Sequence, residues 1–257
     1  IGHTETSRSA AIVNKQKTVF GIQFHPEVVH TEKGTEILKN FVLKVCHANQ
    51  DWTMERFVEN SVENISKVEG NVLCGVSGGI DSTVAALLIH KAIGNRLKCI
   101  FVDNGLLRLN EVEEIESMFK KNFEVNFTKI DGQEQFLSEL EGVIDPEEKR
   151  KIVGEEFVKI FTNFSKENGP FTWLAQGTLY PDVIESGVSK GPASVIKTHH
   201  NVGGLPAWLD LKVLEPLSDL YKDEVRKIAK IIGVPQNLLM RHPFPGPGLA
   251  VRIIGEV

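Results

Sequence analysis

The chain has 257 residues, of which 41% are hydrophobic, which allows one large or two modest domains with a substantial core. Its formal net charge of −5 and the lack of a long basic stretch argue against nucleic-acid binding as its main function. No stretch approaches the length of a transmembrane helix and the first residues carry no signal-peptide pattern, so we expect a cytoplasmic protein with no membrane partner.

The cysteines indicate a reducing compartment. The three cysteines form no Cys-x-x-Cys pair and no even disulfide framework. Cys74 and Cys99 lie inside apolar, strand-like runs, and we expect both to be small buried side chains.

Both ends of the sequence are typical of a piece of a longer protein. The chain starts at Ile1 without an initiator methionine and stops at Val257, just after an apolar run has begun. We therefore expect the domains at both ends to be incomplete.

Residues 1–48 are predicted to be the end of a domain. Residues 18–24 alternate as a strand does, and residues 33–47 carry apolar side chains at helical spacing. His25 and Glu27 lie in the turn between them, where a histidine base and an orienting carboxylate of a nucleophilic triad can lie. A lone His-Pro-Glu is weak evidence, because a satisfied loop histidine is the common alternative. No cysteine has a Gly-x-Cys-x-Gly setting, so the nucleophile is expected upstream of Ile1.

A phosphate-binding loop is the most informative feature of the chain. After a helical pattern over residues 54–65, the apolar run 72–76 leads into Ser-Gly-Gly-Ile-Asp-Ser-Thr at 77–83 and then into a helix that reaches Ile93. Adjacent glycines, hydroxyls and a helix N-terminus suit phosphate oxygens, and a carboxylate at Asp81 suits Mg²⁺ between it and a phosphate. The loop lacks the lysine of a Walker A motif. The alternative is a glycine-rich turn without a ligand.

The rest of the chain alternates strands and helices. We predict strands over 97–102, 124–130, 172–175 and 211–214, and helices over 110–121, 132–141, 146–167 and 222–232. This order predicts an α/β fold, a parallel sheet with helices on both faces and the ligand at the carboxyl ends of the strands. Residues 176–210 show little periodicity and are predicted to be an irregular functional loop.

Further candidates for ligand-binding residues lie in four places along the chain. Asp103 ends a strand, where it can meet a ribose or a metal, or simply form an Asp-Asn-Gly turn. A glycine-flanked stretch contains a lysine and two histidines, Lys197, His199 and His200. We expect this stretch to close over a triphosphate and favour that role over a zinc site. Arg241, beside Pro-Phe-Pro-Gly-Pro-Gly, suits a phosphate. Arg150 is a weaker candidate, since its charged neighbours can form a solvated helix face.

These motifs together resemble one family. Residues 21–31 resemble the end of a class I glutamine amidotransferase domain, and residues 77–83 resemble the PP-loop of ATP pyrophosphatases. With residues 102–108, 176–186, 196–204 and 241–248 they are similar, in order and over essentially the whole chain, to the glutamine-hydrolysing GMP synthetase family. The PP-loop alone would equally fit NAD synthetase, argininosuccinate synthetase or a tRNA thiolase.

The resemblance implies a reaction and its participants. The family is a ligase of purine biosynthesis that adenylates XMP with Mg²⁺-ATP, releases pyrophosphate, and displaces AMP with ammonia from glutamine to give GMP. It implies an adenine nucleotide α-hydrolase-like PP-loop domain at 49–235, an amidotransferase remnant at 1–48 and the start of a dimerisation domain at 236–257. The full-length form is expected to be a homodimer through that C-terminal domain.

The resemblance also assigns roles to residues. It places ATP at Ser77, Gly78, Gly79, Ile80, Asp81, Ser82 and Thr83, with Asp81 as the magnesium ligand. Asp103 and Arg108 are expected near the nucleotide, Arg150 and Arg241 at XMP, and Lys197, His199 and His200 in a lid. His25 and Glu27 match two members of the glutaminase triad. Without its cysteine, the chain is expected to lack glutaminase activity.

Two alternatives remain open from the sequence. One is another PP-loop ligase such as NAD synthetase, with a different acceptor. The other is an ATP-binding module without turnover, because the domains that complete the site are expected to lie outside the chain.

Overall fold

The computed structural model describes residues 1–186, 211–242, 244 and 246–257. The chain divides into two compact units, Ile1–Thr53 and Met54–Val257. Among the described residues, no helix is both long and apolar enough to cross a bilayer.

The first unit is a small hairpin with one helix. Strands β1 (Ala11–Val13) and β2 (Phe20–Ile22) pair antiparallel, and α1 (Gly34–Asn40) continues into a π-helical turn, η1 (Phe41–Val45). The rings of Phe20 and Phe41 meet edge to face at 5.7 Å, which packs the hairpin on the helix. Strand β1 has no counterpart in the sequence prediction, because three residues are too few to show a period.

The second unit is built on five parallel strands in the order β5-β4-β3-β6-β7. The strands are β3 (Val72–Gly75), β4 (Leu97–Asp103), β5 (Asn126–Asp131), β6 (Trp173–Ala175) and β7 (Lys212–Leu214). The helices are α2 (Met54–Ser66), α3 (Ile80–Ile93), α4 (Glu111–Asn122), α5 (Gln133–Leu140), α6 (Pro146–Asn168), α7 (Tyr180–Ser186), α8 (Lys222–Ile231) and α9 (Gln236–Leu239). Short 3-10 turns, η2 (Gly94–Arg96) and η3 (Gly248–Val251), complete it.

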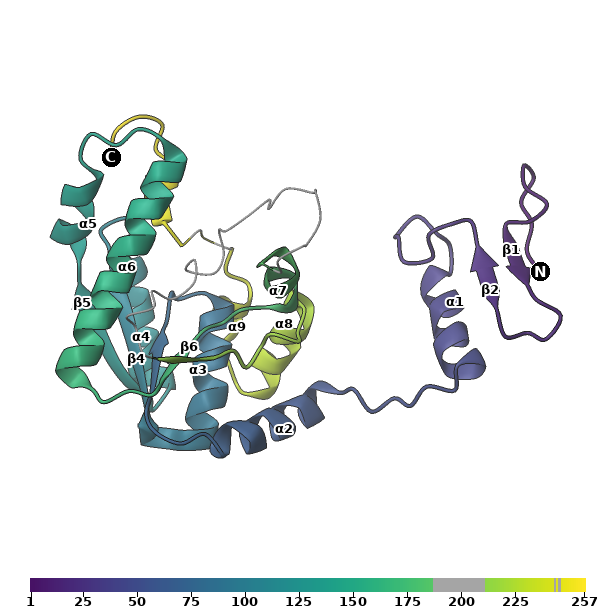
Figure 1. The fold of residues 1–257 in the computed structure, drawn as a ribbon, viewed down its shortest axis with the longest axis horizontal. Coiled ribbons are helices and arrows are strands. Elements are labelled where there is room, and N and C mark those ends of the chain that lie inside the picture. Colours follow the sequence, from purple (N-terminus) through teal and green to yellow (C-terminus); the bar gives the residue numbers. More distant parts are fainter. Residues whose placement is uncertain (187–210, 243, 245) are drawn as a thin grey trace. The chain divides into compact units, whose positions relative to one another are not determined.

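Helices cover both faces of this sheet, as predicted (Figure 1). Side chains of β3 and β4 alternate between the faces, because successive strand residues point to opposite sides. Cys74 and Cys99 join the core beneath α2, α3, α4 and α8, whereas Leu73 and Ile100 lie on the face covered by α6. The central strand β3 is therefore buried on both sides and carries the following loop into the middle of the sheet edge.

The cysteine prediction is confirmed for the two sheet residues. Cys74 and Cys99 are register partners on neighbouring strands, and both are free and buried. A hydrogen bond with the Cys74 thiol, together with burial, raises the pKa of the Cys99 thiol. Both side chains therefore act as small core residues.

One sequence expectation was wrong within the described residues. The stretch 176–210 was predicted to be irregular, but α7 occupies Tyr180–Ser186. The carboxylate of Asp182 accepts a hydrogen bond from the Leu179 backbone N–H at 2.9 Å, and that N–H precedes the helix. A helix of seven residues with a side-chain cap shows too little periodicity to be predicted.

We predict that Leu88→Ala destabilises the second unit by roughly 2–5 kcal/mol, because Leu88 on α3 is fully buried and truncation leaves a cavity. Leu109→Ala is the matched control, since Leu109 is 90% exposed, and it should change stability by less than about 0.5 kcal/mol. Urea unfolding measures both. Equal effects would contradict the assigned core.

Candidate functional site

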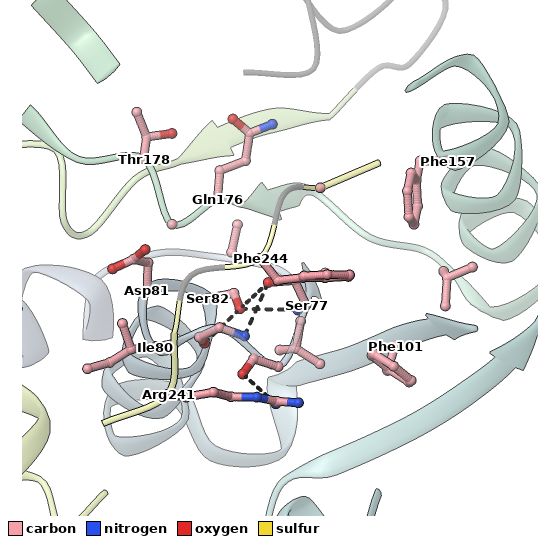
Figure 2. Close-up of a pocket in the computed structure, with 18 of the residues that line it drawn as sticks. Ser77, Ile80, Asp81, Ser82, Phe101, Phe157, Gln176, Thr178, Arg241 and Phe244 are labelled. Carbon is pink, nitrogen blue, oxygen red and sulfur yellow. Dashed lines mark hydrogen bonds between the residues drawn. The ribbon is translucent and has the colours of Figure 1, made fainter. Parts of the chain in front are cut away.

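A cavity of about 600 Å³ lies at the carboxyl ends of β3, β4 and β6 (Figure 2). Its floor is the loop between β3 and α3, and residues after β4, β6 and α9 form its walls. Phe157 and Phe161 of α6 supply an apolar side. Lysine and arginine side chains border the cavity as well: Arg108, Lys222, Arg226 and Arg241. A charged, partly apolar ligand fits such a lining.

Hydroxyl groups close the predicted phosphate loop on itself. The Ser82 Oγ accepts a hydrogen bond from the Ser77 backbone N–H at 3.1 Å and lies 3.1 Å from the Ser77 Oγ. The Thr83 hydroxyl donates to the Gly79 carbonyl at 2.8 Å, and Thr83 is fully buried. Ser77 and Ser82 border the cavity, whereas Thr83 anchors the first turn of α3 from below.

Gly78 has a backbone conformation that other residues rarely adopt, and its surroundings leave no room for a Cβ atom unless Ile115 shifts. Its φ is +72°, and a Cβ atom there would lie 2.2 Å from the Cδ1 of Ile115. Gly79 then begins α3 in an extended conformation, and Ile80 is its first residue. The helix of 14 residues thus directs its free N–H groups and positive dipole end at the cavity. This arrangement suits an anion.

Asp81 has the contacts expected of a carboxylate that meets cations. Its Oδ2 forms an ion pair with the Nζ of Lys222, the first residue of α8. Its Oδ1 is buried and has no hydrogen-bond partner. The carboxylate therefore fits Mg²⁺. Among the described residues no three His, Cys, Asp or Glu side chains gather to hold a metal, so such an ion would need phosphate and water oxygens too.

Asp103 forms the turn that its sequence also allowed. Its Oδ1 accepts from the Gly105 N–H at 3.1 Å and its Oδ2 from the Gln133 Nε2 at 2.9 Å. Only 6% of Asp103 is exposed, and its neighbour Asn104, rather than Asp103, borders the cavity. The expected contact of Asp103 with the nucleotide stays a prediction.

The predicted arginines differ in position. Arg108 borders the cavity, donates to the His242 carbonyl at 3.0 Å and stacks 4.4 Å from the Phe244 ring. Arg150 pairs with Glu147 on α6 and is absent from the cavity wall, the arrangement of a solvated helix face. Arg241 borders the cavity, but its guanidinium is bonded to protein groups. Lys197, His199 and His200 lie outside the described residues.

His25 and Glu27, in the first unit, form the predicted pair. The Nδ1 of His25 lies 2.8 Å from the Oε1 of Glu27, and both side chains are exposed, by 78% and 59%. A hydrogen bond from its own backbone N–H, followed by the bond to His25, lowers the pKa of Glu27. Glu27 thus stays ionised and can orient the imidazole.

Sequence reasoning missed three polar residues of the site. Lys222 carries no local signal, because only the packing of α8 brings it to Asp81. Arg226 lies one helical turn further along α8 and also borders the cavity. Glu111, in the acidic first turn of α4, has the sequence context of a surface residue but is 3% exposed and accepts from the Arg108 N–H at 2.8 Å.

Two family models match the chain, one over most of the first unit and one over part of the second. The family model "Glutamine amidotransferase class-I" matches residues 1–45, and the model "NAD synthase" matches residues 52–158. Over 251 residues the chain is 55% identical to the glutamine-hydrolysing GMP synthase of Acetivibrio thermocellus, covering 96% of the chain. Over 260 residues it is 54% identical to that of Vibrio cholerae, covering all of the chain. Over essentially its whole length, the chain is thus similar to parts of GMP synthases.

The homology has a limited extent. The chain spans about half the length of the curated relatives it matches, 49% and 50% for these two. The resemblance to the end of an amidotransferase domain followed by a PP-loop domain is confirmed.

Solved structures with a similar fold are distant in sequence. The NMN synthetase of Francisella tularensis superimposes with a TM-score of 0.57 at 18% identity, over 77% of this chain and 78% of that one. The ammonia-dependent NAD synthetase of Campylobacter jejuni gives 0.55 at 14% identity, over 75% and 79%. These structures establish the parallel PP-loop fold of the second unit.

We predict that Gly78→Ala distorts the loop, because the added Cβ meets Ile115 at a backbone angle that disfavours side chains. Calorimetry should show binding of Mg²⁺-ATP at least roughly tenfold weaker, the loss of one charge-assisted hydrogen bond or more. Gly154→Ala, inside α6 with no atom near its Cβ position, is the control and should bind normally. Normal binding by Gly78→Ala would contradict the assigned loop.

Proposed function

We propose that the second unit is the ATP-dependent synthetase of a glutamine-hydrolysing GMP synthase. The observation that carries this proposal is the hydroxyl- and glycine-lined loop at the start of α3, which faces the cavity in a chain more than half identical to such enzymes. The participants would be ATP, XMP and ammonia derived from glutamine. We place the reaction in the cytoplasm as part of purine biosynthesis.

The proposed reaction has two steps, adenylation of XMP and displacement of AMP by ammonia. The C2 oxygen of XMP attacks the α-phosphorus of ATP, and the bond to pyrophosphate breaks. Ammonia then attacks C2, AMP leaves with the bonding electrons, and loss of protons from the nitrogen gives GMP. Activation followed by displacement replaces one difficult substitution by two easier ones.

The loop residues hold the triphosphate in this proposal. N–H groups at the start of α3 and the hydroxyls of Ser77 and Ser82 bind phosphate oxygens, while Gly78 lets the backbone approach them closely. Mg²⁺, when bound by Asp81, would neutralise phosphate charge. Positioning and cationic neutralisation are what phosphoryl and adenylyl transfer chiefly need.

Among the residues that the structure describes, Lys222 is the cation that reaches the phosphate loop most directly. It borders the cavity and reaches Asp81 of the loop, where no Walker lysine is present. Arg226, on the same side of α8, adds a second charge. Together they stabilise the negative charge that develops on the leaving group.

The first unit would contribute to ammonia supply. His25 and Glu27 have the separation of a base and its orienter, and we propose that they act with a cysteine nucleophile in the glutaminase of the whole enzyme. We further propose a homodimer formed through a C-terminal domain, of which residues 236–257 are the beginning.

Release of AMP and pyrophosphate by the purified chain tests this function directly. With Mg²⁺-ATP and ammonium, we expect AMP only when XMP is added, with GMP as the second product. AMP release with a nicotinate dinucleotide instead of XMP would favour an NAD synthetase. ATP binding without AMP from any acceptor would make the chain a binding module.

We predict that Lys222→Met weakens Mg²⁺-ATP binding by roughly tenfold and slows AMP formation, since one charge-assisted contact to phosphate is lost. Lys227→Met is the matched control, because Lys227 lies on the same helix in an exposed pair with Asp223. The control should match the parent chain in calorimetry and in the AMP assay. A Lys222 variant with parental affinity would refute the assigned role.

A further inference from the structure

The backbone at Arg241 is held in place by the core. Arg241 follows α9, whose Leu238 and Leu239 are 4% and 6% exposed and belong to the main hydrophobic cluster. The Arg241 N–H donates to the Leu238 carbonyl at 3.2 Å. The side chain therefore starts from a fixed point beside the phosphate loop (Figure 2).

The guanidinium of Arg241 joins two elements of the site. Its Nη2 donates to the Oε1 of Glu111 at 2.7 Å, and its Nη1 donates to the Gly78 carbonyl at 3.2 Å. The Arg241 side chain is 19% exposed and that of Glu111 only 4%. A carboxylate this buried requires its cation, so the pair fixes the guanidinium rather than leaving it free for a ligand.

The bond to Gly78 fixes the direction of a donor. The Gly78 carbonyl and the Gly79 N–H belong to one planar, trans peptide unit and point in opposite directions. With the carbonyl held by Arg241, the Gly79 N–H points the other way and donates a hydrogen bond to the Ser77 Oγ at 3.4 Å, which holds that hydroxyl at the cavity. Rotation of this peptide would instead present a carbonyl oxygen to the phosphates, which repels them.

We propose that Arg241 is a positioning residue for ATP: it orients the Gly78–Gly79 peptide so that its N–H, and not its carbonyl oxygen, lies on the side of the Ser77 hydroxyl that borders the nucleotide cavity. This role rests on the proposed function of the second unit. It differs from the XMP contact expected from the sequence, because a positioning residue affects ATP binding even when XMP is absent.

Calorimetric titration of the chain with Mg²⁺-ATP in the absence of XMP tests the proposal. Arg241→Lys keeps the charge beside Glu111 but cannot span both partners, and we expect roughly tenfold weaker ATP binding. Arg96→Lys is the matched control: Arg96 also donates to two backbone carbonyls, of Val68 and Gly70, but it lies at the opposite end of β4. It should bind ATP as the parent does.

Glu111→Gln gives a second, independent variant. Because it loosens the anchor of the guanidinium, we expect weaker ATP binding, and the double variant with Arg241→Lys should be little worse than either alone. Thermal melting identifies a variant that fails to fold. If one single variant fails, the ATP affinity of the other single variant tests the positioning role. Parental ATP affinity in both variants, with only XMP use impaired, would overturn the positioning role alone. If the parent chain binds no Mg²⁺-ATP, the proposed function fails as well.

Discussion

The site depends on the tight passage from β3 to α3. Strand β3 is the central strand and is buried on both faces, so the loop that follows it starts from a fixed point at the sheet edge. Ile115 of α4 occupies the space where a Cβ of Gly78 would lie. Packing beneath the loop and the bond from Arg241 to the Gly78 carbonyl therefore hold its conformation together, and the N–H groups of α3 are preorganised for an anion.

The cavity is bordered by lysine and arginine side chains although the chain as a whole is acidic. A protein with a net charge of −5 offers no general attraction to a triphosphate, so the cations must come from nearby elements. Helix α8 supplies Lys222 and Arg226, and the segment after β4 supplies Arg108. Arg241 differs from these cations, because its charge is paired with the buried Glu111 and its guanidinium binds the Gly78 carbonyl of the phosphate loop.

The two units carry chemically distinct sites. In the first, an exposed imidazole and carboxylate lie 2.8 Å apart, a pair that can move a proton once a nucleophile is nearby. In the second, backbone donors, hydroxyls and cations surround a cavity and offer charge stabilisation. Under the proposed function, the first site would act in supplying ammonia and the second in consuming it.

The sequence alone determined the parallel α/β fold and the phosphate loop, because strand and helix periods and the Ser-Gly-Gly-Ile-Asp-Ser pattern are local. It also paired His25 with Glu27, two residues apart. Only the tertiary structure brought Lys222 to Asp81 and buried Glu111 beneath Arg241, and for Asp103 it shows the turn that the sequence had allowed. The contacts of Lys222 and Arg241 join residues 141 and 130 positions apart, and packing of whole helices, not any local pattern, decides which of them meet.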